Sequence, residues 1–187
     1  MKRAIILLLS LILTLQLFSC TANETGTPET TPTPNEPVSF AGVDSWLSHG
    51  TLKISGRTRA PREAVKSASV SAAKNESESV QLSFRSDENI EGLSLNVIGN
   101  AEGITPEIFE EYLIPTGATT IPDAIVPLTE EFSLVAEETK TFLLRFCIGE
   151  NAASGEHKYT VQLCHGKTVI ESYDITLNVM SFSLPRE

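Results

Sequence analysis

The chain has 187 residues, a formal net charge of −10 and an apolar share of 41%. After its leading segments this length allows one domain, and a domain of about 150 residues buries roughly 70% of the surface of its unfolded chain. The acidic balance argues against nucleic acid or an anionic lipid surface as a partner, because both attract clustered basic residues.

The first twenty residues predict export. A basic start is followed by an apolar run over 4–18, and the run ends in small residues. A membrane-spanning helix needs about 20 apolar residues, whereas a signal peptide has a shorter run and a small-residue end. Residues 17–20 (LFSC) resemble the lipobox of bacterial lipoproteins, although Phe18 is larger than the usual residue there. We expect a lipoprotein signal peptide at 1–19 and a lipid on Cys20, with ordinary secretion or an uncleaved membrane anchor as the alternatives; all three export the domain.

The next segment, 20–37, contains repeated Thr-Pro pairs and no large apolar side chain. Such a composition cannot bury enough surface to offset the entropy of ordering, so we expect a disordered, extended linker. Through the lipid on Cys20, the membrane would be a partner, because two or more acyl chains anchor stably. The domain would then stand at a bacterial cell surface or on the periplasmic face of a membrane.

Residues 38–187 form the predicted domain. Apolar and polar side chains alternate there with a period of two, which is typical of strands with one buried face. The pattern is clearest over 80–85, 93–97, 141–148, 159–164 and 172–182. Turn-forming residues separate these segments at short intervals. We predict an all-β fold, an Ig-like antiparallel β-sandwich.

One short helix is predicted, over Pro106–Tyr112. Thr105 is a suitable N-cap residue, and a proline is tolerated in the first helical turn. The residues that follow, 112–115, are apolar and compatible with a strand.

Cys147 and Cys164 are predicted to be free thiols on outward-facing positions of successive strands. If these strands form a hairpin in which Ile148 faces His157, the two cysteines lie about 20 Å apart along the ladder. A disulfide needs Cα atoms within about 7 Å of each other.

No metal site, cofactor site or catalytic set is predicted. The histidines are isolated, and the sequence has neither a Cys-x-x-Cys nor a Gly-x-Ser-x-Gly motif. Acid–base catalysis by a pair of carboxylates needs both groups to converge on one bond. Adjacent residues on a strand point to opposite faces, which argues against the acidic pairs at 110–111, 130–131 and 137–138.

Two further features are candidates for surface contacts. Trp46 is the only tryptophan and the one weak candidate for a carbohydrate contact. Arg57, Arg59 and Arg62 form the only basic cluster of the domain, which predicts a solvated edge or a docking surface for an acidic neighbour.

Four segments resemble, in this order, the N-terminal β-sandwich of proteins related to glycoside hydrolase family 123, the DUF4091 group. They are 72–82 (AAKNESESVQL), 121–128 (IPDAIVPL), 152–161 (AASGEHKYTV) and 177–185 (LNVMSFSLP). The third lacks the second glycine of the family pattern. The resemblance spans most of 46–185.

These motif residues favour scaffold roles. We expect Asn75 to hold a turn and Glu76 to accept backbone N–H groups or to pair with Arg85. Pro122-Asp123 predicts a turn opening, because proline fixes φ and aspartate bonds its own backbone. Gly155 is expected to supply a positive φ.

In that family, catalysis lies on a following (β/α)₈-type barrel with an acidic pair. The resemblance implies a truncated chain: a non-catalytic accessory domain of a surface-anchored glycoside hydrolase-like lipoprotein, whose barrel lies beyond Glu187. Whether the parent protein is an enzyme rests on this resemblance. The alternatives are a stand-alone carbohydrate-binding module with glycan as a partner, or an Ig-like surface spacer. The scarcity of aromatic residues counts against the binding module.

Overall fold

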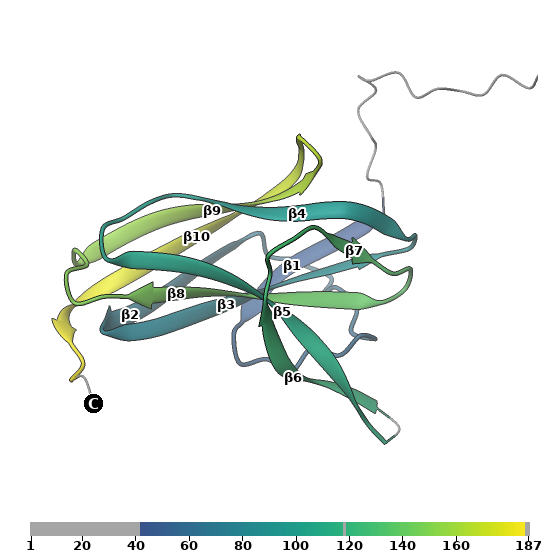
Figure 1. Cartoon of the computed structure of the whole chain (residues 1–187), viewed down its shortest axis with the longest axis horizontal. Coiled ribbons are helices and arrows are strands. Elements are labelled where there is room, and N and C mark those ends of the chain that lie inside the picture. Colours follow the sequence, from purple (N-terminus) through teal and green to yellow (C-terminus); the bar gives the residue numbers. More distant parts are fainter. Residues whose placement is uncertain (1–41, 118, 186–187) are drawn as a thin grey trace, which may run out of the picture. The chain divides into compact units, whose positions relative to one another are not determined.

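The computed structural model describes residues 42–117 and 119–185, which form two β-sheets packed face to face (Figure 1). The predicted signal peptide at 1–19, the linker at 20–37 and the lipidation site Cys20 lie outside the described residues. Within the described residues there are ten strands and no helix, which confirms the predicted all-β class and its sandwich architecture.

Sheet A contains five strands in the order β1-β3-β8-β5-β6. Their bounds are Val43–His49 for β1, Glu76–Ser86 for β3, Thr139–Ile148 for β8, Ile104–Thr116 for β5 and Thr119–Pro127 for β6. Sheet B has the order β2-β10-β9-β4-β7. Its bounds are Ser67–Lys74 for β2, Thr168–Ser183 for β10, Gly155–His165 for β9, Ile90–Ile98 for β4 and Phe132–Leu134 for β7.

The core lies between the two sheets. It is formed by the inward-facing apolar residues of the alternating segments, as predicted. Phe84 of β3 is fully buried, and its ring centre lies 5.8 to 6.1 Å from the rings of Phe132, Phe142 and Tyr173. Burying each large apolar side chain contributes about 1.5–3 kcal/mol. The other predicted inward residues that join this core are Val80, Leu82, Leu144, Phe146, Ile148, Tyr159, Val161, Leu163, Ile175, Leu177 and Val179.

The predicted helix over Pro106–Tyr112 is wrong, because these residues belong to strand β5. Ile104 and Ile108 pair with Ile148 and Leu144 of β8, so the ladder and the core decide the backbone conformation here. Near Pro106, β5 pairs only with β8, since its pairing with β6 starts at Phe109. A proline is therefore tolerated, because its missing N–H faces the unpaired edge.

Two pairing predictions also need correction. The hairpin that pairs Ile148 with His157 does not form, since β8 lies in sheet A and β9 in sheet B. The prediction drawn from it is nevertheless confirmed, because Cys147 and Cys164 are both free. The sandwich is also not purely antiparallel: β2 runs parallel to β10. Two parallel strands cannot be joined by a tight turn, and here β2 and β10 are separated in the chain by β3 to β9, which belong to both sheets.

The motif residues mostly take their expected scaffold roles. Asn75 has a φ of 62° in the turn between β2 and β3, and Glu76 Oε2 accepts a hydrogen bond from the Ala73 N–H at 2.7 Å. Gly155 has a φ of 117°. Arg85, in contrast, pairs with Glu137 instead of Glu76.

Candidate functional site

The outer face of sheet A is covered by residues 50–66, which we call the covering segment. Gln81 Nε2 donates a hydrogen bond to the Leu52 carbonyl at 2.9 Å, and the Thr139 N–H donates to the Gly56 carbonyl at 2.9 Å. These two contacts hold the segment across β3 and β8. As a result, Gln81 and Arg85, which point away from the core, are only 2% and 7% exposed.

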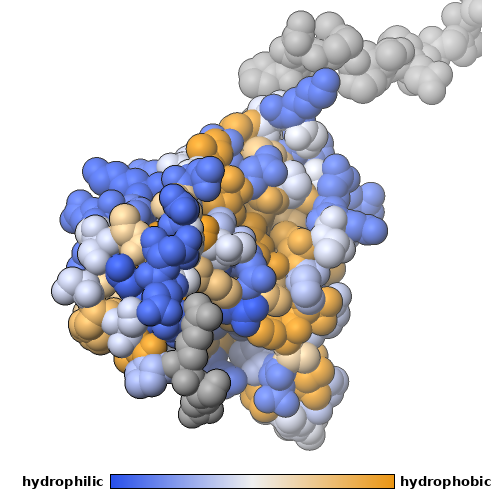
Figure 2. Space-filling view, turned by 60° about the vertical axis from the view of Figure 1, so that its left-hand side comes forward, coloured by the Kyte–Doolittle hydropathy of each residue, from blue (hydrophilic) through white to orange (hydrophobic). Residues whose placement is uncertain are grey.

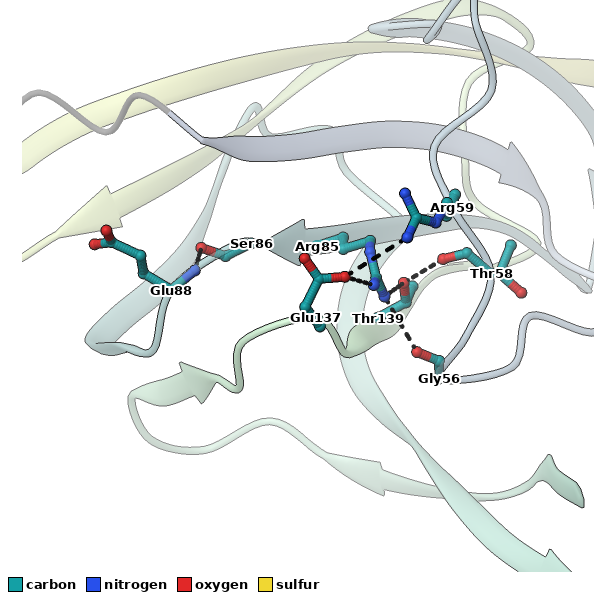
Figure 3. A network of polar contacts seen from close by, with 8 residues as sticks. All are labelled: Gly56, Thr58, Arg59, Arg85, Ser86, Glu88, Glu137 and Thr139. Atoms are coloured by element: carbon teal, nitrogen blue, oxygen red, sulfur yellow. Dashed lines mark hydrogen bonds and ion pairs between the residues drawn. The ribbon is translucent and has the colours of Figure 1, made fainter.

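A buried arginine fastens the covering segment to the sheet (Figure 3). Arg85 donates to the Gly56 carbonyl at 3.4 Å and to the Glu137 carboxylate, which also lies 3.8 Å from Arg59. Thr139 Oγ1 donates to the Thr58 carbonyl. Because these bonds satisfy polar groups that the segment shields from water, the segment can bury charge without leaving it unpaired. We call this network the Arg85 clasp.

Trp46 lies beneath the covering segment. It is opposite Ser83 on the outer face of sheet A, whereas the next residue, Leu47, joins the core between the sheets. Its side chain is 3% exposed, and Ile54 of the segment is 2% exposed. In this structure the indole therefore presents no open ring face on which a sugar could stack.

A hollow with a mixed polar and apolar lining opens beside the covering segment, between the 50–53 stretch and the β5–β6 hairpin. Its volume is about 170 Å³, and its lining includes Lys53, Gln81, Glu111, Asp123 and Leu143. Gln81 Nε2 donates to Glu111 Oε1 at 2.7 Å, and Lys53 Nζ donates to the Pro122 carbonyl at 3.1 Å. We call this feature the Glu111 hollow.

Glu111 is half-buried, and its surroundings act on its acidity in two directions. Burial raises the pKa of this carboxyl above its ordinary value, because the desolvated carboxylate is disfavoured. The hydrogen bond from Gln81 and the positive charge of Lys53 oppose this increase. A group of this kind in a concave site is a candidate for function.

The expected turn at Pro122-Asp123 is wrong, because both residues lie inside β6. Tyr112 pairs with Ala124 and Leu113 with Pro122, so Asp123 is the extra residue of a β-bulge. The bulge is the feature that places Asp123 at the Glu111 hollow. Proline next to aspartate indicated an irregular backbone at this point. The same residue types are found in bulges and in turns, so the sequence did not distinguish the two.

The β5–β6 hairpin carries a second surface feature. The register places Tyr112, Ile114, Ile121 and Val126 on one face, and their exposed fractions run from 39% to 48%. This face continues the side of β5 on which Ile108 packs against the core. In Figure 1 the hairpin extends beyond the two packed sheets. We call these four residues the apolar hairpin face.

Other apolar residues reach the surface as well, and Figure 2 shows a broad orange band of apolar residues between hydrophilic ones. Met180 and Phe182 at the end of β10, and Leu184 directly after it, are 39% to 54% exposed. This end is fixed in place, since Asn75 Nδ2 donates to the Leu184 carbonyl at 3.1 Å. The turn motif around Asn75 thus holds the last motif of the chain.

The charged candidates are dispersed. Glu110 and Glu111 point to opposite faces of β5, as predicted, because Glu110 pairs with Lys140 at 2.9 Å while Glu111 bonds Gln81. The basic cluster at 57–62 lies in the covering segment, and its three arginines are exposed.

Across 42–117 and 119–185, no group of three or more His, Cys, Asp or Glu residues could hold a metal ion. The same residues include no helix that could span a membrane.

No protein-family model matches the sequence, and a search of curated proteins finds no match. Among solved structures, a family 123 glycoside hydrolase from Clostridium perfringens, studied for glycolipid glycan hydrolysis, is similar with a TM-score of 0.61 at 10% identity. The match covers 76% of this chain and 28% of that one. This likeness shows a shared β-sandwich fold, and this chain spans about 28% of the length of that relative.

Two further solved structures match less well. AvmM, which catalyses macrocyclization in alchivemycin A biosynthesis, has a TM-score of 0.39 at 9% identity, covering 83% of this chain and 98% of its own. The ASH/PapD-like domain of human CEP192 has a TM-score of 0.36 at 8% identity, covering 88% of this chain and all of its own. Neither likeness carries a functional argument.

Proposed function

We propose that this domain is the non-catalytic accessory β-sandwich of a surface-anchored, glycoside hydrolase-like lipoprotein. In this proposal the apolar hairpin face docks on a catalytic barrel that lies outside this chain. The proposal is supported by the fold shared with a family 123 glycoside hydrolase, which is several times longer than the matched region. The observation that carries it is the apolar hairpin face.

The apolar hairpin face is suited to a side-chain interface. It extends the core-facing side of sheet A to a place where its residues stay 39% to 48% exposed. Contiguous exposed apolar residues usually mark an interaction site, and an aromatic residue such as Tyr112 is a common anchor of binding energy. Pro122, Pro127 and the bulge at Asp123 disfavour strand addition at the edge of β6, so the contact would use the face of the hairpin.

The end of β10 supplies a second argument. The exposed residues Met180, Phe182 and Leu184 precede the last residues of this chain, and Asn75 holds the Leu184 carbonyl. A following domain would therefore leave the sandwich from a fixed position and meet an apolar surface on its way. A fixed exit limits the orientations of such a domain and lowers the entropy cost of docking.

The test is the reading frame that encodes residues 180–187 in the source genome. We expect the reading frame to continue for the length of a barrel domain. A stop codon directly after Glu187 would overturn the accessory role and would leave a surface spacer or a stand-alone carbohydrate-binding module as the function. With the continuous protein, Tyr112→Asp should lower the melting temperature of the following domain. Ile98→Asp is the matched control, because Ile98 is 52% exposed on β4 of the other sheet.

Surface anchoring has its own test. In a bacterial host, a lipid on Cys20 predicts incorporation of labelled palmitate and recovery of the protein with membranes. Cys20→Ser should abolish both, whereas Cys147→Ser should leave both unchanged. Equal labelling of wild type and Cys20→Ser would overturn the lipid anchor.

A further inference from the structure

We propose that the Glu111 hollow binds a single neutral sugar unit, with the Glu111 carboxylate accepting hydrogen bonds from neighbouring hydroxyl groups. This site is separate from the apolar hairpin face and from Trp46, and it would give the domain a ligand of its own. The proposal goes beyond the accessory role and does not depend on it.

The carboxylate is held in place before any ligand arrives. Gln81 Nε2 donates hydrogen bonds to the Leu52 carbonyl at 2.9 Å and to Glu111 Oε1 at 2.7 Å. Gln81 Oε1 accepts a hydrogen bond from Ser48 Oγ at 3.3 Å. In the described part of the chain, Gln81 is the one hydrogen-bonding partner of this carboxylate. A fixed carboxylate with an available oxygen can accept a second hydrogen bond at a low entropy cost.

The charges of the hollow favour a neutral ligand. Lys53 brings a positive charge to the lining, while Glu111 and Asp123 bring negative charges. A cation would meet the ammonium group and an anion would meet two carboxylates, so neither is well matched. An ammonium group has three donors, and one of those of Lys53 serves the Pro122 carbonyl. The remaining Lys53 donors can donate hydrogen bonds to the hydroxyl groups of a ligand, and the two carboxylates can accept hydrogen bonds from them.

The size and the apolar lining narrow the ligand further. The volume of about 170 Å³ is several times the share of about 30 Å³ that one water occupies in the liquid. It is smaller than the roughly 300 Å³ at which sites for drug-sized ligands begin. Leu52, Ile125 and Leu143 add apolar surface that can contact C–H groups. A hydroxyl-rich ring with C–H faces, as in one sugar unit, fits these properties.

Glu111 also costs stability where it stands. A carboxylate that loses water without an ion-pair partner is unfavourable, and the salt bridges in the described residues do not include Glu111. Its neighbour Glu110, by contrast, is paired with Lys140 at 2.9 Å. We therefore expect Glu111→Gln to keep or raise the stability of the fold, as is common where a charged group serves binding and not folding.

The experiment is an NMR titration of the full, ¹⁵N-labelled chain with galactose, glucose and mannose, each up to about 50 mM, a range suited to millimolar affinity. At least one sugar should shift the amide signals of Lys53, Gln81 and Glu111. Glu111→Gln should weaken this binding about tenfold or more while its melting temperature stays equal or rises. Glu110→Gln, on the opposite face of β5, is the matched control and should bind as the wild type does.

Several outcomes would overturn the proposal. These are no shift with any of the three sugars, equal binding by Glu111→Gln, and the same shifts with glycerol at equal concentration. Larger shifts with methylammonium chloride would assign the hollow to a cationic group. Tyr112→Asp, which tests docking of the hairpin, should leave sugar binding unchanged, so a failure of one proposal is distinguishable from a failure of the other.

Discussion

The two faces of strand β3 are both buried, but by different kinds of contact. Val80, Leu82 and Phe84 pack against sheet B and are at most 2% exposed. Gln81 and Arg85 on the other face are 2% and 7% exposed, and hydrogen bonds to the covering segment account for their burial. Alternation therefore identifies the apolar face of a strand but does not decide whether the polar face meets water.

Phe84→Ala tests the apolar face and should have the largest effect. The side chain is fully buried and touches rings from both sheets, so its removal leaves a cavity that the sandwich fills only in part. We expect the free energy of unfolding to fall by about 3–5 kcal/mol, measured by urea denaturation. A loss below about 1 kcal/mol would show that the core at this point is loosely packed.

Arg85→Met tests the polar face. The variant keeps the length of the side chain but removes its bonds to Gly56 and Glu137, which should cost about 2 kcal/mol. Because Trp46 is the only tryptophan, its emission should shift to longer wavelength as the covering segment loosens. Arg59→Met is the control: this exposed side chain lies 3.8 Å from the same carboxylate, and its loss should change stability by less than about 0.5 kcal/mol.

High pH should weaken the contact between the two sheets at Tyr173. Burial raises the pKa of this phenol, so the folded state keeps a proton that the unfolded state releases. The stabilisation is full below about pH 10, the ordinary pKa of tyrosine, and falls above it by up to about 1.4 kcal/mol per pH unit. Tyr173→Phe should flatten this decrease, measured by urea denaturation between about pH 9 and 11. An unchanged slope would contradict the assignment.

The smallest effects should separate two buried tyrosines at neutral pH. Tyr173 Oη donates to Ser45 Oγ at 2.7 Å, whereas the Tyr159 hydroxyl has no hydrogen-bond partner among the described residues. Tyr173→Phe should therefore cost about 1 kcal/mol, while Tyr159→Phe should be neutral or slightly stabilising. Equal losses from both variants in thermal unfolding would show that the hydroxyl groups do not differ in this way.

The sequence predicted the core well because the signal is local. In the five alternating segments, the residues expected to face inward are the ones that fill the space between the sheets. The period of two follows from strand geometry and needs no knowledge of the partner strand. Local reasoning failed at 106–112. The residues there form a helix-start pattern, but the pairing of β5 with the distant strand β8 decides the backbone conformation.

The surface features were harder to predict. The Glu111 hollow joins Gln81 of β3, Glu111 of β5 and Lys53 of the covering segment, and no spacing in the sequence relates these three. Trp46 illustrates the same difficulty: a lone tryptophan on a strand is a candidate sugar contact by its sequence, yet in the folded domain it is only 3% exposed. Only Asp123, beside a proline in an edge strand, carried a local sign of irregular backbone.

The sequence by itself determined that the five alternating segments form strands and which of their faces is apolar. Tertiary structure alone decided which strands are neighbours, that β2 runs parallel to β10, and that the covering segment buries a polar face. The reason is that side-chain alternation is encoded residue by residue. The contacts that choose partners, such as that between Arg85 and Glu137, join residues far apart in the chain and exist only after the sheets have formed.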